Sequence, residues 1–213
     1  MSKTVFFTRP NYDDVTAYLY HFSKELLNES RSRGFKTLSK EGQNATKTVV
    51  EGVIKKNNPD FIMFNGHGNE EVICGQNDDP LIQYGENHEL LRKRITYALA
   101  CNCAQKLGRT VADQNTTFIG YSESFAVGMD INCQASIHRD KRAKMFLEPS
   151  NLLVKSILKG NSASEAVSKA KEAMKKNISL LRTDTSPDAK DYIPFLFNNW
   201  VCLEVLGQTQ AKL

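Results

Sequence analysis

Two short apolar runs, each followed by a chemically reactive side chain, stand out in the hydrophobic pattern of the chain. The first run covers residues 60–65 and leads into Gly66-His67-Gly68, and the second covers residues 95–100 and leads into Cys101. Short apolar runs bounded by Gly, Asn or Pro are typical of strands buried on both faces of a sheet. Helical patterns flank both runs, so the pattern predicts a largely parallel sheet in an α/β protein.

The rest of the pattern predicts helices and strands on both sides of these two runs. A strand over residues 4–8 precedes a helix from about residue 13 to residue 34, whose apolar positions recur at steps of three and four. The elements expected next are a short strand within 35–43, a helix over 45–56, a β-hairpin of 71–74 and 80–84, and a short helix over 87–91. Those expected after the second run are a helix over 102–113, a strand over 116–121, helices over 139–159 and 162–180, and a final short helix and strand through Trp200 to Leu206.

Length and composition favour a single domain over residues 1–213, because 213 residues with 40% hydrophobic content suit one large core. Lys plus Arg (28) exceed Asp plus Glu (24) by only four, and no aromatic residues interleave the basic stretches 138–144 and 169–176. We therefore expect no nucleic-acid partner. No stretch reaches the roughly 18 apolar residues of a membrane span and the amino terminus shows no signal region, so we expect a cytoplasmic protein without membrane contact.

The chemistry expected at the sheet edge follows from where parallel strands end. Their carboxyl ends meet at one edge of the sheet, where function collects in open α/β proteins. His67 and Cys101 would meet there as a base and a nucleophile. A helix that began just after Cys101 would favour its thiolate. The plainer alternatives are a turn histidine without a role and a buried, inert cysteine at a strand end.

These residues resemble a known family. Gly-His-Gly after one strand and Ala-Cys after the next are similar to the caspase-like fold of the clan CD cysteine peptidases, and the CHAT-domain proteases look closest. The strand 118–121, the helical segment 158–170 and a closing aromatic strand around Trp200 fit the same resemblance. It implies a three-layer α/β/α sandwich with a mainly parallel central sheet of about six strands.

The resemblance also implies roles for individual residues in a cysteine endopeptidase. Cys101 would be the nucleophile, His67 the acid and base, and the backbone N–H groups of Gly68 and Cys101 the oxyanion hole. The family pattern requires no third catalytic side chain, no metal and no cofactor. The partners implied are a protein or peptide substrate and an activating protein, or alternatively processing within the basic segment 138–144.

The chain also departs from the family pattern. His67 and Cys101 are 34 residues apart (101 minus 67), fewer than the roughly 50 of the caspase signature. Leu99 stands where several relatives that cleave after basic residues carry an aspartate. Glu123 and Asp130 are the candidates for an S1 pocket that binds a basic side chain, with solvated loop charges as the alternative. Cys103 is the rival nucleophile and ranks second to Cys101.

Two functions of other kinds remain open on the sequence. The domain would be a catalytically inactive caspase-like binding module if the thiol proved unreactive. It would be a non-peptidase cysteine hydrolase if the same dyad acted on small esters. Fold alone does not decide between these functions.

Overall fold

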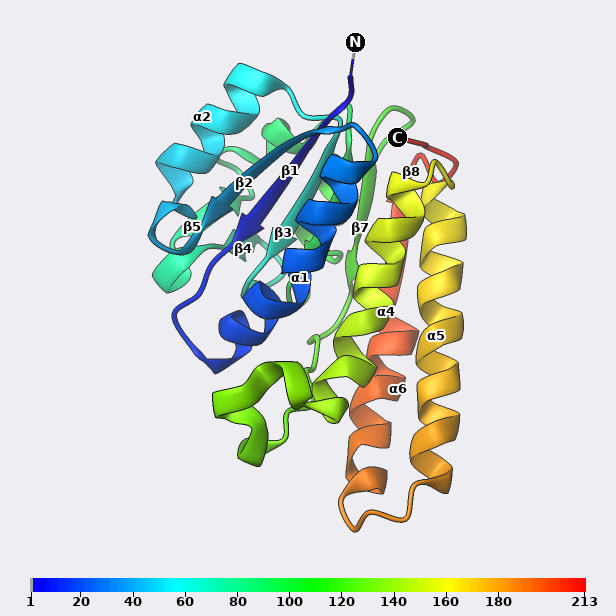
Figure 1. The fold of residues 1–213 in the computed structure, drawn as a ribbon. Helices are drawn as coiled ribbons and strands as arrows, with labels where there is room; N and C mark the ends of the chain where they lie inside the picture. Colours follow the sequence, from blue (N-terminus) through cyan, green and yellow to red (C-terminus); the bar gives the residue numbers. More distant parts are fainter. Residues whose placement is uncertain (1) are drawn as a thin grey trace.

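A six-stranded sheet forms the centre of the molecule in a computed structural model, which describes residues 2–213. The strand order is β2-β1-β3-β6-β7-β8, and only β8 runs antiparallel to its neighbour (Figure 1). The strands are β1 (Thr4–Arg9), β2 (Lys36–Glu41), β3 (Phe61–Asn65), β6 (Ile95–Leu99), β7 (Thr117–Tyr121) and β8 (Leu203–Gly207). The prediction of a mainly parallel sheet of about six strands is therefore confirmed.

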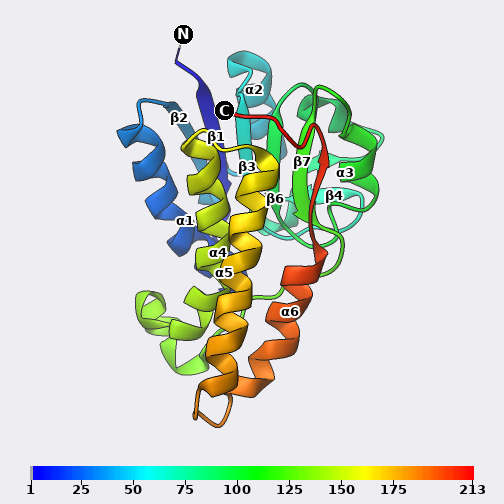
Figure 2. The same ribbon diagram turned by 90° about the vertical axis from the view of Figure 1, so that its right-hand side faces the viewer.

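Helices cover both faces of this sheet and complete the three layers. The helices α1, α4 and α5 pack on one face, whereas α2 and α3 pack on the other with a separate hairpin (Figures 1 and 2). The helices are α1 (Asp14–Ser32), α2 (Lys47–Asn57), α3 (Lys106–Val111), α4 (Lys141–Leu158), α5 (Ala163–Thr183) and α6 (Ile193–Cys202). The hairpin pairs β4 (Val72–Cys74) with β5 (Pro80–Gln83), as the pattern predicts.

Short 3₁₀ segments occupy several connections between these elements. They are η1 (Gly42–Asn44), η2 (Gln76–Asp78), η3 (His88–Leu91), η4 (Ile131–Arg139) and η5 (Ala189–Tyr192). Helix α6 continues below the sheet alongside α5 before the chain turns back into β8 (Figure 1). Within residues 2–213, no helix is both long enough and apolar enough to cross a membrane.

The core follows from the alternation of side chains along the central strands. In β3, Phe61 and Met63 face the core under α1, α4 and α5, whereas Ile62 and Phe64 face the core under α2 and α3. All four side chains are fully buried, which is why these strands read as continuous apolar runs.

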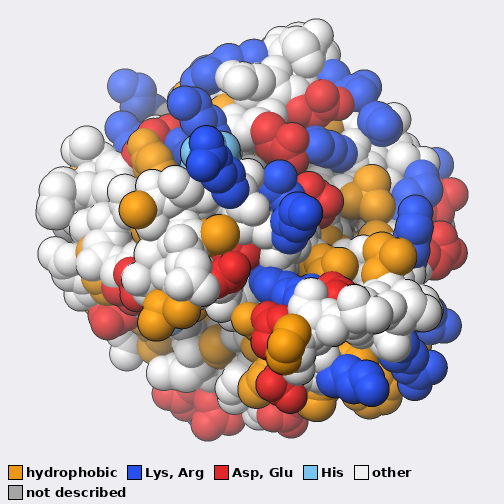
Figure 3. Space-filling view, turned by 60° about the horizontal axis from the view of Figure 1, so that its bottom comes forward, with side chains coloured by type: hydrophobic (Ala, Val, Ile, Leu, Met, Phe, Trp, Pro, Cys, Tyr) orange, Lys and Arg blue, Asp and Glu red, His pale blue; other side chains and the backbone are white. Residues whose placement is uncertain are grey.

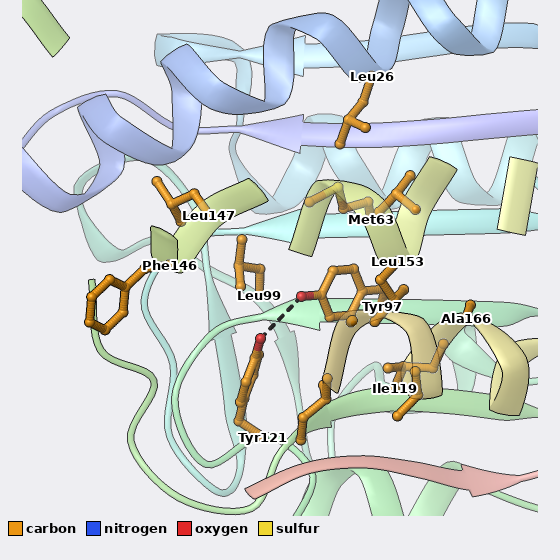
Figure 4. Packing of buried hydrophobic residues seen from close by; sticks show 14 of the residues in the cluster. Leu26, Met63, Tyr97, Leu99, Ile119, Tyr121, Phe146, Leu147, Leu153 and Ala166 are labelled. Carbon is orange, nitrogen blue, oxygen red and sulfur yellow. Dashed lines mark hydrogen bonds between the residues drawn. The ribbon is translucent and has the colours of Figure 1, made fainter. Parts of the chain in front are cut away.

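Tyrosine hydroxyl groups meet inside the larger core. The hydroxyl groups of Tyr97 in β6 and Tyr121 in β7 share a hydrogen bond of 3.3 Å (Figure 4). The Tyr121 hydroxyl also lies 3.4 Å from the hydroxyl of Ser150 in α4. These contacts satisfy hydroxyl groups that would otherwise be buried without a partner.

Two local predictions are wrong and one is confirmed in detail. The helix expected over 102–113 begins only at Lys106, because Asn102 adopts a left-handed backbone conformation (φ 57°) that a helix cannot continue through. Trp200 lies in α6 rather than in the closing strand. The predicted start of α5 is confirmed, since Ser162 and Glu165 form a capping box.

Candidate active site

The pairing of β3 with β6 places His67 and Cys101 at matching positions beyond the sheet. Asn65 pairs with Leu99 in the parallel register, and each reactive residue comes two positions later in its chain. Neighbouring strands lie about 4.8 Å apart, so the two loops leave the sheet side by side. The two residues that the sequence singles out therefore belong to adjacent loops at one edge of the sheet.

The loop that carries His67 is held by the β4–β5 hairpin. The carbonyl of His67 accepts a hydrogen bond of 2.9 Å from the backbone N–H of Cys74. Gly66 has φ +148°, and a Cβ atom there would lie 2.4 Å from the carbonyl oxygen of Cys74. Glycine at position 66 thus allows the hairpin to lie directly against the loop.

The imidazole of His67 contacts a carboxylate from another loop. Its Nε2 atom lies 2.6 Å from Oδ2 of Asp13, and both side chains are partly exposed (36% and 38%). Partial burial opposes ionisation of Asp13, but hydrogen bonds from Thr16 and His67 outweigh it and hold the pKa of Asp13 below its ordinary value. An ionised carboxylate only accepts hydrogen bonds, so Nε2 is the donor and the neutral ring keeps its lone pair on Nδ1.

Asp13 is fixed by the start of helix α1. Its other carboxylate oxygen, Oδ1, accepts a hydrogen bond of 2.7 Å from the backbone N–H of Thr16. The Thr16 hydroxyl in turn accepts from the N–H of Asp13 at 3.0 Å, which completes a capping box. One carboxylate therefore caps the helix and orients the histidine.

The loop that carries Cys101 is joined to the segment that follows β7. The thiol of Cys101 donates to the carbonyl oxygen of Phe125 at 3.6 Å. The backbone N–H of Asn102 donates to the carbonyl of Glu123 at 3.1 Å, and that of Ala104 donates to the carbonyl of Tyr121 at 3.1 Å. These bonds hold the half-buried thiol beside the chain that leaves β7.

No helix begins directly after Cys101. Residues 101–105 form turns, and α3 has only six residues. The expectation that a helix amino end just after Cys101 would favour its thiolate is therefore wrong, because four residues (102–105) lie between Cys101 and α3 and the dipole effect fades within a turn.

Burial disfavours ionisation of the other thiols. Cys103, the rival nucleophile, is fully buried, and burial raises the pKa of its thiol well above the ordinary value. Its Sγ atom lies 3.2 Å from the carbonyl oxygen of Cys101. Burial also raises the pKa of Cys74 and Cys202 to about 11 and shifts the pKa of Cys133 upward.

Within residues 2–213, the backbone N–H groups of Gly68 and Cys101 are among the donors of these loops that the rest of the protein leaves free. Gly68 forms an isolated antiparallel bridge with Ile73. The hydrogen bonds of this bridge are made by the neighbours of Gly68: Asn69 donates to the carbonyl of Val72, and the carbonyl of His67 accepts from Cys74. Free donors on neighbouring loops are what an oxyanion hole requires.

Glu123 and Asp130, the residues expected to form an S1 pocket, lie in two separate hollows. Glu123 lines a hollow of about 590 Å³ with Glu70, Gln105 and Lys106. Asp130 lines another of about 560 Å³, together with the basic side chains of Arg139, Lys141 and Arg142.

The carboxylate of Asp130 is already engaged. It accepts hydrogen bonds of 2.9 and 3.0 Å from the backbone and side-chain amides of Asn132, which lower its pKa. Of the two residues, only Glu123 lies on the segment bonded to the cysteine loop, through its carbonyl. The residues 2–213 hold no group of three or more His, Cys, Asp or Glu side chains suited to a metal ion.

Asp13 is the site residue that the sequence analysis missed. In the sequence it stands in Asn-Tyr-Asp-Asp before an amphipathic helix and reads as an ordinary helix cap. The one indication in the sequence was that Asp13 lies in the loop that follows the first strand. The order β1-β3-β6 predicts that residues following these three strands lie in a row, with the histidine between the other two.

Comparison with known proteins gives similarity in structure but none in sequence. No protein-family model matches the chain, and no curated protein matches it. Gingipain R, an Arg-specific cysteine proteinase, superposes with a TM-score of 0.62 at 10% identity, over 99% of this chain and 47% of that one. A complex of the pro- and mature domains of RgpB from Porphyromonas gingivalis superposes with a TM-score of 0.57 at 8% identity, over 97% of this chain and 47% of that one.

The chain thus spans about half the length of these two structures. At such identities the likeness concerns the fold, because unrelated functions share folds. The order of the strands, the single antiparallel edge strand and the helices on both faces agree with that likeness. The chain has the caspase-like α/β/α fold found in the clan CD cysteine proteinase gingipain R.

Proposed function

We propose that the protein is a cysteine endopeptidase in which Cys101 is the nucleophile and His67 the acid and base. The observation that carries this proposal is the shared register of the two loops, combined with the 2.6 Å contact between His67 and Asp13. A histidine held by a carboxylate, on the loop next to that of a half-buried thiol, supplies the two groups that nucleophilic catalysis by cysteine requires.

In the proposed reaction His67 takes the thiol proton on Nδ1, and the thiolate of Cys101 attacks the carbonyl carbon of a peptide bond. The carbonyl oxygen then carries negative charge, which the free N–H groups of Gly68 and Cys101 stabilise. His67 returns its proton to the amine that leaves, and an acyl group remains on the sulfur. Water adds to this thioester, giving up a proton to His67, and the acid product leaves as the thiol reforms.

Asp13 would act as a positioning residue in this reaction. Its carboxylate keeps the proton of the neutral ring on Nε2, so that Nδ1 is the nitrogen that takes up and returns a proton. It also stabilises the imidazolium that forms when the thiol ionises. This role adds a third side chain to the dyad expected from the family resemblance.

Regulation by a second polypeptide segment is part of the proposal. One of the similar structures is a complex of a pro-domain with a mature domain, and a covering segment of that kind would control access to a half-exposed dyad. The closer likeness to CHAT-domain proteases and a cytoplasmic location stay predictions from the sequence.

The test is covalent labelling of the intact protein with peptidyl acyloxymethyl ketones. A panel with Arg, Lys, Asp, Asn and Leu next to the reactive group is applied to the wild type and to Cys101→Ala, His67→Ala and Cys103→Ala. We expect one adduct by mass, lost in Cys101→Ala and His67→Ala and kept in Cys103→Ala. Labelling that survives in Cys101→Ala would contradict the assignment of the nucleophile.

A further inference from the structure

An apolar hollow lies on the chain that leaves β7. It has a volume of about 490 Å³ and is lined by residues 126–129 together with Asp191, Tyr192 and Phe195. Asp191 is the one charged side chain in this lining. Phe195 is 56% exposed, so its ring adds exposed apolar surface to this lining. The face of the molecule at the lower end of the sheet carries apolar patches among charged side chains (Figure 3).

Two asparagines of α6 hold the wall of this hollow in place. The amide of the buried Asn199 makes two hydrogen bonds with Ala126, accepting from its N–H at 2.9 Å and donating to its carbonyl at 2.7 Å. Asn198 donates to the carbonyl of Ser124 at 2.8 Å. Segment 124–126 is therefore fixed on α6 by side-chain amides, which make the backbone hydrogen bonds that a neighbouring strand would otherwise make.

The lining at Gly128 and Met129 is packed tightly against the residues behind it. A Cβ atom on Gly128 would lie 2.4 Å from the ring of Phe146 and 2.7 Å from the ring of Tyr192. The carbonyl of Met129 accepts a hydrogen bond of 3.2 Å from the Tyr192 hydroxyl. The hollow thus has a preformed back wall, as pockets for specific ligands usually do.

The hollow begins next to the proposed nucleophile. The carbonyl of Phe125 contacts the thiol of Cys101, and the lining starts at the following residue. Successive Cα atoms are about 3.8 Å apart, so the lining begins within roughly 10 Å of the sulfur. A peptide held at Cys101 in an extended form would reach the hollow within about three residues, at about 3.3 Å per residue.

The same segment offers free backbone groups to such a peptide. Within residues 2–213, neither the N–H nor the C=O of Val127 makes a hydrogen bond, and neither does the N–H of Phe125. Ala126, which lies between them, has both its N–H and its C=O bonded to Asn199 of α6. Free backbone groups of this kind can pair with a peptide that adds as a strand.

We propose that this hollow is a specificity pocket that receives a large apolar side chain of the substrate, within about three residues of the bond attacked by Cys101. The proposal rests on the proposed peptidase function and names its substrate class: peptides with an aromatic or long aliphatic residue near the cleavage site. The apolar lining, with no basic side chain and one carboxylate among the lining residues, favours such a residue over a charged one.

The test measures peptide binding to the Cys101→Ala variant by fluorescence anisotropy, so that binding is read without cleavage. The peptides are six residues long, and each position is fixed in turn as Phe, Leu, Ser, Asp or Arg. We expect Phe or Leu at one position to bind at least tenfold more tightly than Ser, Asp or Arg. Adding Phe195→Ala should reduce this preference about tenfold, the effect of about 1.4 kcal/mol of lost contact.

Phe197 is the matched control, because it lies on the same helix, is 50% exposed and does not line the hollow. Phe197→Ala should leave the preference unchanged. The proposal is overturned if no position prefers an apolar residue, or if Phe197→Ala removes the preference as fully as Phe195→Ala.

Cleavage of the same peptides by the wild type separates the two proposals. Apolar selectivity in binding, with no hydrolysis by the wild type, would support the pocket and count against the peptidase. Hydrolysis without apolar selectivity would support the peptidase and overturn the pocket.

Discussion

Asp13 and His67, 54 residues apart in the sequence, meet through Oδ2 and Nε2 at 2.6 Å. The same carboxylate caps helix α1 through its other oxygen. Removing it should therefore affect both the fold and the reaction, and the two effects can be separated by the choice of substituent.

Asp13→Asn keeps an oxygen that can cap the helix but removes the negative charge. We expect its free energy of unfolding to lie within about 0.5 kcal/mol of the wild-type value, since Asn and Asp are similar caps. Its kcat/KM should fall at least tenfold, because the imidazolium loses its counter-charge. Asp13→Ala should lose a further ~1 kcal/mol of unfolding free energy with the cap. Urea unfolding and peptide hydrolysis check the two effects, and an Asn variant with full activity would refute the positioning role.

Acid should weaken the fold through the same carboxylate. The pKa of Asp13 is lower in the folded protein than its ordinary value of 3.8, so its ionised form stabilises the fold above that pH. This stabilisation is lost as the pH falls from about 4 through the folded pKa. Between pH 5 and pH 3, the urea midpoint of the wild type should therefore fall more than that of Asp13→Asn. A difference independent of pH over this range would mean that the carboxylate is not held as described.

The five thiols should differ in their rate of alkylation. Burial raises the pKa of Cys74, Cys103, Cys133 and Cys202, and only the thiolate reacts. We expect iodoacetamide at pH 7.5 to modify Cys101 first, as read by peptide mapping after short exposures. The His67→Ala variant should react more slowly at Cys101, because the proposed base that accepts the thiol proton is gone, and at an unchanged rate at the other four thiols. Modification of Cys103 before Cys101 in the native protein would contradict the assignment.

Gly68 should not tolerate a side chain. A Cβ atom there would lie 2.7 Å from the sulfur of Cys103 and 2.8 Å from the carbonyl oxygen of Val72. Gly68→Ala should lower the free energy of unfolding by about 1–3 kcal/mol through overpacking. It should also lower kcat, with a smaller effect on KM, because the proposed oxyanion donor moves.

Gly52 provides the control for that substitution. It lies exposed in α2, and a Cβ atom there would meet nothing within 4 Å. Gly52→Ala should raise the unfolding free energy by about 0.5–1 kcal/mol through helix propensity and leave activity unchanged. Equal effects of the two substitutions would show that the tight packing around Gly68 has been misjudged.

The hydrogen bond from the Tyr18 hydroxyl to the buried carboxylate of Asp140 should stabilise the fold. That hydroxyl donates to Oδ2 of Asp140 at 2.8 Å, and both residues are almost fully buried. Tyr18→Phe removes a donor from a buried charged group and should cost about 1.5–3 kcal/mol of unfolding free energy. Tyr20→Phe, which removes a bond of 3.1 Å to the half-exposed Glu41, should cost less than about 1 kcal/mol in the same urea titration.

The fold was predictable from the sequence because its strands are locally marked. The runs over 60–65 and 95–100 are apolar at most of their buried positions, Asn65 and Thr96 excepted, and glycine and asparagine mark their ends. The turn after Cys101 was not predictable, because its apolar spacing at Ala104, Leu107 and Val111 is also that of a helix. The backbone of Asn102 breaks that helix by bonding to Glu123, a contact across 21 residues (123 minus 102) that no local pattern records.

The candidate site was predictable only in its two reactive side chains. Asp13 was missed because its capping role accounts fully for its place in the sequence. The asparagines of α6 were missed because their partners, Ser124 and Ala126, lie more than 70 residues away in the chain (198 minus 124 is 74). Such contacts depend on how the layers pack, which is decided by the whole core rather than by a neighbouring segment.

The order of the strands has a consequence for the newly synthesised chain. Asp13, His67 and Cys101 follow three strands that become neighbours only when β1, β3 and β6 have all paired, and parallel pairing needs a helix or a long crossover between strands. Such long-range pairing makes folding slow. A partly synthesised or damaged chain therefore carries the three side chains far apart, and the proposed activity would be acquired only together with the finished sheet.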